Sequence, residues 1–463
     1  APAALRATAG VIRLAADGTE TVLRESSNDL ICWDRSDEPN REFAVQCTSE
    51  GNLARVKQNR AWNMSGKTAD EIRAMRETAE ADGTREVSVF GSAYYALSGA
   101  DAESANLHTT IAVPFATTES LAYGPCRNPW NTGHGTGGSS GGAAAAVASG
   151  MLPAANASDG GGSIRIPAAM CGLVGLKPSR GRVSMGPVKE EWGLSVQHVV
   201  CHTMRDSAAI LDATAIPFLG DGVVAPDHGR PWVDQTGRDP GSLRIGFMDH
   251  SPRTEVHPDC ADPTRRTAAM LEDLGHHVED AHPPALEQID ELGWAFGVNW
   301  GVGAVLSLEH LGGQLGREVT EADVEPGTWF LAERGRDISA VDYARAQGAM
   351  STFRRSMAEW WESGFDLLVT PTTALPPPPI GELTPTDDDP VRGSKRSMPY
   401  ATFTSPFNTT GQPAISLPLG SSDGLPVGVQ LVAAYGREDL LIAVGSQLEA
   451  EARWSDHRAP IHA

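Results

Sequence analysis

Positive charge is in short supply in this chain, which has 37 lysines and arginines against 59 aspartates and glutamates, a formal net charge of −22. Nucleic acids and anionic membranes bind proteins through clustered basic side chains. This balance therefore predicts no nucleic-acid partner and no membrane partner. Few side chains can serve as a lysine base, because the whole chain has only Lys57, Lys67, Lys177, Lys189 and Lys395.

Metal-binding and membrane-spanning patterns are also lacking. The six cysteines form no C-x-x-C pair and the thirteen histidines no H-E-x-x-H motif, so we expect no metal and no cofactor. A chain of this length does not need disulfides for stability, which favours free thiols in a reducing compartment. No apolar run reaches the ~18 residues of a membrane span, and no signal segment opens the chain. We therefore expect a cytoplasmic protein.

Strand and helix patterns alternate along the chain. Leu243–Phe247 and Phe365–Val369 have the pattern of short buried strands, and Thr267–Leu274 that of a helix ending at Gly275. Such alternation predicts an α/β fold, a single large domain over residues 1–463 with a central mixed β-sheet covered by helices. Residues 190–361 are richer in helical patterns, so we expect them to form a peripheral helical layer.

Two segments rich in glycine and serine carry the most informative pattern. Gly137–Gly142 runs directly into Ala143–Ala148, and alanine has the highest helix propensity, so this segment is expected to be a loop that leads into a helix. Three consecutive glycines precede Ser163. Glycines let the backbone turn tightly and aim successive N–H groups at one point. A serine at the end of such a turn is well placed as a nucleophile beside an oxyanion hole.

Shorter motifs overlap the first of these segments. Gly133-x-Gly135-x-x-Gly138 matches the dinucleotide-binding pattern, and Gly138-x-Ser140-x-Gly142 matches the nucleophile elbow of α/β-hydrolases. Both motifs require a buried strand directly before them, and the sequence there does not have that pattern. We therefore reject both interpretations.

The glycine- and serine-rich segments resemble the amidase signature family. The resemblance rests on segments in two regions, at residues 120–190 and 365–450, which would form the signature core. These segments are Gly137–Gly142, Asp159–Pro167, Cys171–Pro178, Pro406–Ser416 and Gly424–Gln430. Ser139 and Ser163 lie 163 − 139 = 24 residues apart, which is the family's own spacing. Within the family, residues 316–325 and 434–441 resemble bacterial amidases near the nylon-oligomer cyclic-dimer hydrolases.

The resemblance implies a Ser–cis-Ser–Lys hydrolase that cleaves a small carboxylic amide through an acyl-enzyme. Ser163 would be the nucleophile, and Ser139, after a cis peptide bond, would pass the proton to a lysine. The backbone N–H groups of Gly160, Gly161, Gly162 and Ser163 would form the oxyanion hole. Asp159 and Arg165, which flank this turn, are expected to form a structural ion pair.

The first third of the chain departs from the family pattern, which places the catalytic lysine on an apolar strand before an aspartate. Upstream of Ser139 the chain has only Lys57 and Lys67, at separations of 139 − 57 = 82 and 139 − 67 = 72 residues. The second separation is nearer to the family's and favours Lys67, whereas the strand-like surroundings of Lys57 favour Lys57. An amine accepts a proton only when it is neutral, a form that burial favours.

Two other functions are compatible with the sequence. The same fold motif occurs in amidotransferase subunits of tRNA-dependent complexes, although the net charge of −22 disfavours direct contact with tRNA. A catalytically inactive amidase-like scaffold would account for the missing lysine motif. The expected partner is a small-molecule amide, and the sequence leaves a homodimer open.

Overall fold

The computed structural model describes residues 7–28, 30–39, 42–82, 84–86, 93–99, 101, 106–111, 116–120, 124–186, 193–384, 389 and 392–462. Contacts divide the chain into two compact units. Unit 1 comprises residues 1–115 with residue 463, and unit 2 comprises residues 116–462. A single domain over residues 1–463 stays a prediction.

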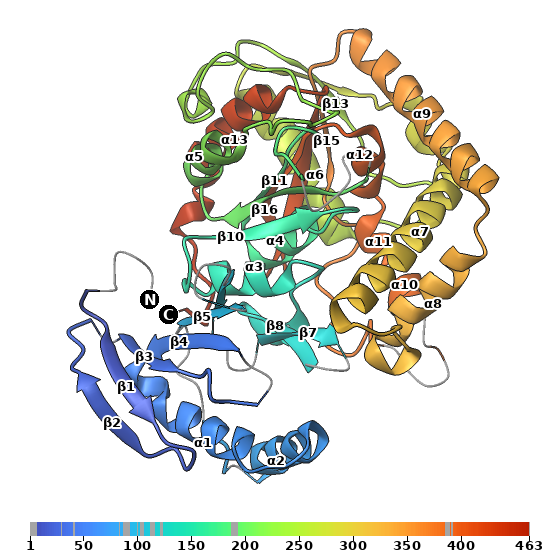
Figure 1. The fold of residues 1–463 in the computed structure, drawn as a ribbon. Coiled ribbons are helices and arrows are strands. Elements are labelled where there is room, and N and C mark those ends of the chain that lie inside the picture. Colours follow the sequence, from blue (N-terminus) through green and yellow to red (C-terminus); the bar gives the residue numbers. More distant parts are fainter. Residues whose placement is uncertain are drawn as a thin grey trace. The chain divides into compact units, whose positions relative to one another are not determined.

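Unit 1 is built on a six-stranded sheet with the strand order β2-β1-β3-β4-β5-β6 (Figure 1). Neighbouring strands are antiparallel, except that β1 and β3 pair in parallel. The strands are β1 (Gly10–Leu14), β2 (Glu20–Arg24), β3 (Leu30–Asp34), β4 (Phe43–Ser49), β5 (Ala93–Gly99) and β6 (Asn106–Ile111). Two helices, α1 (Leu53–Asn63) and α2 (Ala69–Ala81), lie between β4 and β5 in the chain.

Helix α1 corrects one prediction, because Lys57 lies in this helix and not in a strand-like segment. Leu53 and Val56, three residues apart, pack on the apolar side chains of β1 and β3. Arg60, four residues further on, is buried and hydrogen-bonds Glu38 and the carbonyl of Leu14. This spacing of three and four residues places one face of a helix against the sheet.

A disulfide corrects the expectation that every cysteine is a free thiol. Cys32 and Cys47 lie directly opposite each other on the antiparallel strands β3 and β4 and are joined. Which residues face each other across two strands depends on the register of the pairing, and the spacing of the cysteines in the sequence does not give this register. The other cysteines are free and buried, namely Cys126, Cys171, Cys201 and Cys260.

Unit 2 contains an eight-stranded sheet with the order β10-β12-β11-β16-β17-β15-β13-β14, and a three-stranded sheet of β7, β8 and β9 (Figure 1). In the large sheet, pairing is antiparallel from β10 to β15 and parallel from β15 to β14. This mixed sheet confirms the predicted α/β fold. Its strands are β10 (Ala154–Asp159), β11 (Val174–Lys177), β12 (Val196–Cys201), β13 (Arg244–Phe247), β14 (His277–Asp280), β15 (Leu367–Pro371), β16 (Ala414–Ser422) and β17 (Leu425–Ala433). The small sheet has β7 (Ala116–Ser120), β8 (Gly124–Asn128) and β9 (Asn131–Gly135).

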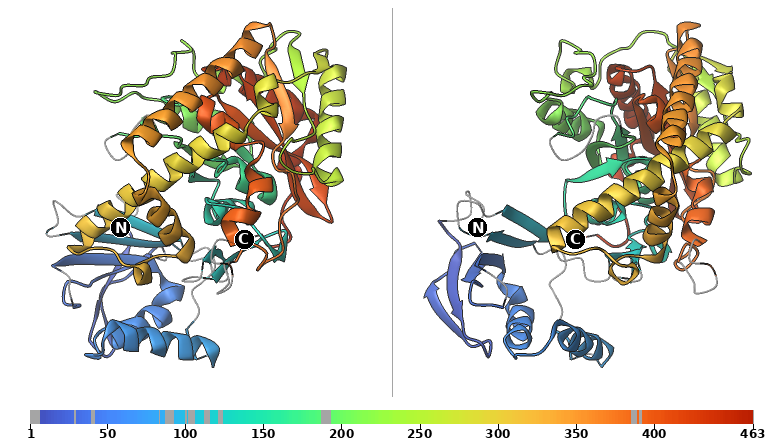
Figure 2. Two further views of the ribbon diagram at one scale, coloured as in Figure 1. Left: turned by 90° about the vertical axis from the view of Figure 1, so that its right-hand side faces the viewer. Right: turned by 45° about the vertical axis from the view of Figure 1, so that its right-hand side comes forward.

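Helices cover both faces of the large sheet. Successive residues of β15 show this, because Leu367 and Val369 pack into one apolar core and Leu368 into another. The first core contains side chains of α5, α6 and α13, and the second contains side chains of α7 and α9. Helices α7 and α9 lie side by side (Figure 2). The helices of unit 2 are α3 (Gly141–Ala148), α4 (Arg165–Cys171), α5 (Met204–Thr214), α6 (Pro258–Asp273), α7 (Asp290–Leu315), α8 (Pro326–Arg336), α9 (Ala340–Glu362), α10 (Arg392–Arg396), α11 (Met398–Ala401), α12 (Ser405–Thr410) and α13 (Glu438–Ala452).

The elements predicted in unit 2 are present, with differences at their ends. Strands β13 and β15 coincide with the two predicted strands to within two residues. Helix α6 begins nine residues earlier than predicted, because His257 caps it and Pro258 occupies its first position. Residues 193–361 contribute α5 to α9, and they also contribute β12, β13 and β14 to the sheet. The domain boundaries drawn from the sequence stay predictions.

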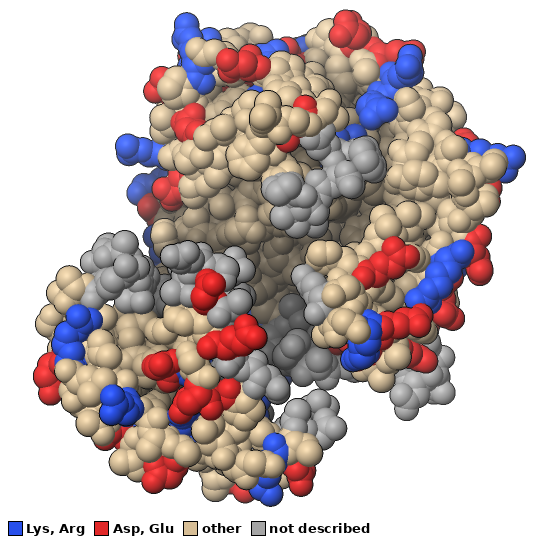
Figure 3. All heavy atoms as spheres, viewed as in Figure 1, with Lys and Arg blue, Asp and Glu red and all other residues tan. Residues whose placement is uncertain are grey.

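Two features of the described residues bear on the surroundings of the protein. No helix among them is long and apolar enough to cross a membrane. On the face drawn in Figure 3, basic side chains are scattered among acidic ones. This arrangement fits a chain whose net charge is −22.

Candidate active site

Ser163 is presented by a glycine turn in which Gly162 requires a glycine conformation. Strand β10 ends at Asp159, three glycines follow, and α4 begins two residues after Ser163. Gly162 has a φ of +136°, which side chains of L-residues disfavour. A Cβ atom there would also lie 2.4 Å from Oγ1 of Thr404 and 2.5 Å from Cδ1 of Ile166. The turn leaves Ser163 half-buried at the start of α4.

Ser139 lies at the start of α3, in the loop-then-helix arrangement that the sequence predicts. The peptide bond between Gly138 and Ser139 is cis, and the side chain of Ser139 is exposed. The neighbouring Ser140 occupies the N-cap position of α3, and its Oγ accepts a hydrogen bond from the N–H of Ser158 at 3.2 Å. This bond ties the loop to β10. The same bond engages the side chain of Ser140, which would be the nucleophile under the rejected nucleophile-elbow pattern.

The two serine-bearing loops pack on the same side chain. A Cβ atom built on Gly137 would lie 3.1 Å from Cγ2 of Ile166, and one on Gly162 would lie 2.5 Å from Cδ1 of that residue. Ile166 belongs to the first turn of α4. The structure therefore brings the loop of Ser139 and the loop of Ser163 together, as the sequence spacing indicates.

A buried ion pair supports the glycine turn. The guanidinium of Arg165 lies 2.9 Å from the carboxylate of Asp159, and neither side chain is exposed. The same carboxylate accepts hydrogen bonds from the N–H groups of Gly162, at 2.7 Å, and Ile164, at 3.2 Å. Burial alone would raise the pKa of Asp159, but the charge of Arg165 and the amide of Asn408 outweigh burial and lower this pKa to about 2. The ion pair that the sequence predicts is confirmed.

Residues from the C-terminal third of unit 2 complete this network. Arg165 donates hydrogen bonds to the side chains of Gln430, at 2.8 Å, and Asn408, at 2.7 Å. It also donates to the carbonyl of Thr404, whose own hydroxyl donates to the carbonyl of Gly161 at 2.7 Å. The family resemblance includes Asn408 and Gln430 by position, but sequence reasoning assigned them no role. The structure identifies them as hydrogen-bond partners of Arg165, which holds the turn before Ser163 in place.

The predicted oxyanion hole needs one correction. The N–H of Gly162 already donates to Asp159, so this group is not available to a substrate oxygen. In the part of the chain that the structure describes, no hydrogen bond uses the N–H groups of Gly160, Gly161 or Ser163. Ser195 and Trp300 lie beside Gly160, and Phe296 lies beside Gly161. These side chains border the space in front of the turn, and the sequence analysis had missed them because they come from distant segments.

The predicted lysines lie in unit 1. Lys57 is in α1, and its amine forms an ion pair with Glu20 at 2.7 Å. Lys67 is exposed, immediately before the Thr68 cap of α2. The role of either lysine stays a prediction.

Unit 2 has a buried lysine of its own, Lys177, at the end of β11. Its amine donates to the carbonyl of Pro178 at 3.0 Å. Burial, and next the charge of Arg165, lower the pKa of Lys177 well below its usual value. The hydrogen bond supports the loop after β11.

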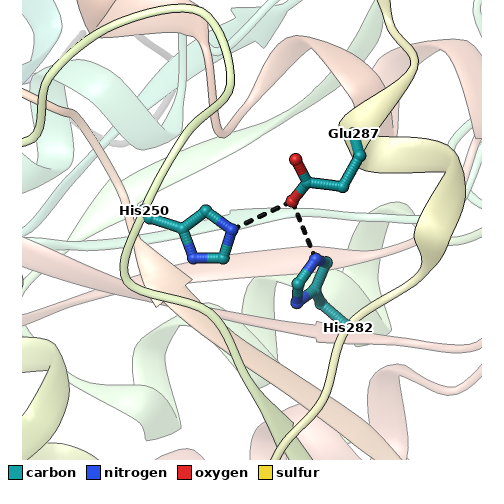
Figure 4. Close-up of side chains that lie close together, drawn as sticks. All are labelled: His250, His282 and Glu287. Atoms are coloured by element: carbon teal, nitrogen blue, oxygen red, sulfur yellow. Dashed lines mark hydrogen bonds and ion pairs between the residues drawn. The ribbon is translucent and has the colours of Figure 1, made fainter.

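Away from the serine loops, His250, His282 and Glu287 form a group that could hold a metal ion (Figure 4). Nε2 of each histidine lies 2.9 Å from the same oxygen of Glu287. Nδ1 of His282 is buried without a partner. Metal-bound histidines normally donate from this second nitrogen, so a metal on Nε2 would leave a buried donor unsatisfied. The two hydrogen bonds by themselves account for the positions of these side chains.

Comparisons of family model, sequence and structure all match this chain to amidases. The Amidase family model matches residues 105–442. The 6-aminohexanoate-cyclic-dimer hydrolase of Paenarthrobacter ureafaciens is 42% identical over 354 residues, which cover 74% of this chain and 72% of that protein. A putative amidase, AmiC, of Mycobacterium tuberculosis is 38% identical over 358 residues, covering 74% and 71%. A solved structure of 6-aminohexanoate cyclic dimer hydrolase has a TM-score of 0.71 at 41% identity, covering 74% and 73%. Lys57 and Lys67 lie before the first residue of the family match.

Proposed function

The chain belongs to the amidase family of amide hydrolases, and we propose that it cleaves a small carboxylic amide through an acyl-enzyme on Ser163. The observation that carries the proposal is the glycine turn of residues 160–162. Held by Asp159 and Arg165, this turn sets Ser163 beside N–H groups that have no acceptor among the described residues. N–H groups fixed in this way stabilise the negative oxygen of a tetrahedral intermediate.

The reaction has two halves. Oγ of Ser163 attacks the amide carbonyl carbon, while its proton passes to Oγ of Ser139 and the proton of Ser139 passes to a neutral lysine amine. The carbonyl π electrons move to oxygen, which the N–H groups of Gly160, Gly161 and Ser163 stabilise. When the intermediate collapses, the C–N bond breaks and the leaving amine takes the proton back along the same route. Water then hydrolyses the ester and releases a carboxylate.

Lys67 is the first candidate for the base, and Lys57 is the second. The Lys57 amine is paired with Glu20 at 2.7 Å, and a neighbouring negative charge favours the protonated amine, which cannot accept a proton. Lys67 has the separation from Ser139 nearer to the family's. Loss of activity in Lys67→Ala with retained folding would assign the base to Lys67, whereas retained activity would move the assignment to Lys57.

The substrate assays follow from the relatives. The relatives at 42% identity carry the name 6-aminohexanoate-cyclic-dimer hydrolase, so a cyclic amide of a linear amino acid is the first substrate to assay, beside linear and aryl amides. The buried free thiols of unit 2 fit a reducing, cytoplasmic compartment, whereas the Cys32–Cys47 disulfide does not. A cytoplasmic location and a homodimer stay predictions, which fractionation and sizing of the purified protein would test.

Labelling with a serine-reactive fluorophosphonate tests the nucleophile. We expect an adduct on Ser163, none in Ser163→Ala, and unchanged labelling in the control Ser140→Ala, whose side chain bonds β10. An adduct on Ser140 and none on Ser163 would refute the assignment of Ser163 as the nucleophile. Amide hydrolysis only in the presence of a partner protein would indicate an amidotransferase subunit. A folded protein that neither labels nor hydrolyses any amide in the panel would indicate an inactive scaffold.

A further inference from the structure

Unit 2 has a pocket of about 520 Å³ that shares no residue with the two serine loops. One wall is the face of α9 that carries Arg354 and Trp361, and another is formed by Thr409 and Gln412 near the end of α12. Arg180 and Tyr435 add to the polar lining. A pocket of this size can hold a small organic molecule.

Buried polar atoms without partners gather around this pocket. They are Nε of Arg180, Nε1 of Trp361, Oγ1 of Thr409 and Oε1 of Gln412, and all four belong to lining residues. Folded proteins leave few such atoms unsatisfied, so four of them in the wall of one pocket mark a wall that is rich in polar groups. Three of the four can donate a hydrogen bond. Because each of these atoms is buried, a bound molecule would reach it only if the side chains of the wall shift.

The charges around the pocket favour an anionic ligand. Arg180 and Arg354 both line the pocket, and among the described residues no ion pair joins either of them to a carboxylate. Burial, and next the charge of Arg354, lower the pKa of Arg180 to about 10. Arg180 donates to the carbonyl of Asn408 and, at 3.4 Å, to that of Thr409, and Arg354 donates to the hydroxyl of Ser351 at 3.3 Å. These acceptors are neutral and Arg354 is open to solvent, so Arg180 is the largely buried cation of this pocket without a carboxylate partner among the described residues.

The other lining residues indicate which groups the ligand carries besides its negative charge. Leu194, Met350 and Ala434 are apolar and line the same pocket, so the ligand has a hydrocarbon part. Glu362 lies on the lining and is exposed, which disfavours a second negative charge on the ligand. A guanidinium matches the planar geometry of a carboxylate. We propose that this pocket binds a short aliphatic monocarboxylate, with its carboxylate at Arg180 and Arg354 and its chain against the apolar wall.

The pocket is linked to the frame of the nucleophile turn. The amide of Asn408 donates to the carbonyl of Leu194, in the pocket wall, at 3.1 Å and to the carbonyl of Asp159 at 2.8 Å. Every amide hydrolysis releases a carboxylate, so the proposed reaction itself produces a ligand of this class. Binding itself does not rest on the proposed function, because it is measured without turnover.

Calorimetric titration of the full-length Ser163→Ala protein with hexanoate tests the proposal. We expect one site per chain, and binding of 1-hexanol and of inorganic phosphate about tenfold or more weaker, since the first lacks the charge and the second the chain. Equal affinity for hexanoate and 1-hexanol, or no heat of binding with hexanoate, would overturn the proposal.

Two neighbouring arginines of α9 supply a matched pair of variants. Arg354 and Arg355 are both exposed, but only Arg354 lines the pocket. We expect Arg354→Met to weaken hexanoate binding about tenfold or more and Arg355→Met to leave it unchanged. Equal effects of the two substitutions would mean that hexanoate binds elsewhere. Hexanoate that still blocks fluorophosphonate labelling of Ser163 in the Arg354→Met protein would place it in the active site and refute the proposal.

Discussion

Replacing Asp159 with asparagine removes a buried charge while keeping the size of the side chain. Arg165, which lies 2.9 Å away and is not exposed, would then be an uncompensated charge. Removing one partner of a buried ion pair costs about 3–5 kcal/mol. For a large domain, 1 kcal/mol lowers the melting temperature by roughly 2 °C, so a decrease of about 6–10 °C is expected. Amidase activity should fall as well, because the carboxylate also accepts the N–H groups of Gly162 and Ile164.

The control is an ion pair of the same length on the surface. Glu333 and Arg336 are 3.0 Å apart and exposed, and such pairs contribute little to stability. Glu333→Gln should therefore leave both the melting temperature and activity nearly unchanged. If Asp159→Asn and Glu333→Gln shift the melting temperature equally, burial does not set the strength of the Asp159–Arg165 pair.

The pH dependence gives a second readout of the same pair. The pKa of Asp159 is about 2 in the folded protein and about 4 in an unfolded chain, so its stabilising contribution is full above pH 5. It is lost as the pH falls from about 5 toward 2, because the unfolded chain then binds the proton more readily. The difference in melting temperature between the wild type and Asp159→Asn should shrink over this range. A difference that stays constant down to pH 3 would contradict the assigned pKa.

Gly162→Ala should lower thermal stability and activity together, because its Cβ would overlap neighbouring side chains. The control is Gly237→Ala, since Gly237 also has a positive φ but has open space around it. Equal losses of melting temperature in the two variants would exclude overlap as the cause. The lowered pKa of Lys177 makes the wild type gain stability as the pH rises toward about 10. Lys177→Met should therefore show a flatter dependence of melting temperature on pH in alkaline solution. Parallel curves for the two proteins would contradict this. Removing the Cys32–Cys47 disulfide by Cys47→Ser should destabilise unit 1 by about 3 kcal/mol; faster hydrogen exchange confined to unit 1 would support this, and faster exchange in unit 2 would not.

The features of this protein that the sequence predicts correctly depend on neighbouring residues. The three glycines before Ser163 and the alanines after Ser140 are local signals, and the structure contains the corresponding turn and helix. Strands β13 and β15 are short apolar runs that end near a turn residue, and both are present. These patterns suffice because backbone geometry over a few residues decides the outcome.

The features that sequence reasoning misses depend on contacts between distant residues. Asn408 and Gln430 meet Arg165 across 243 and 265 residues, and no local pattern indicates such a contact. The strand register that joins Cys32 to Cys47 is likewise set by pairing across the sheet. The sequence does not predict helix α1, because its apolar spacing is interrupted by Arg60, a charged residue that the fold buries with Glu38.

The long span of the Arg165 network has a consequence for the order in which the protein folds. When Arg165 leaves the ribosome, Asp159 has already emerged, but Gln430 follows 265 residues later. At synthesis rates of roughly 5–20 residues per second, this interval takes roughly 13 to 53 seconds. A nascent chain that ends before β17 therefore has Ser163 but not the contact with Gln430 that fixes its turn. Hydrolytic activity is expected only after the last strand of the sheet has been synthesised, so premature termination should give inactive protein even when both serines are present.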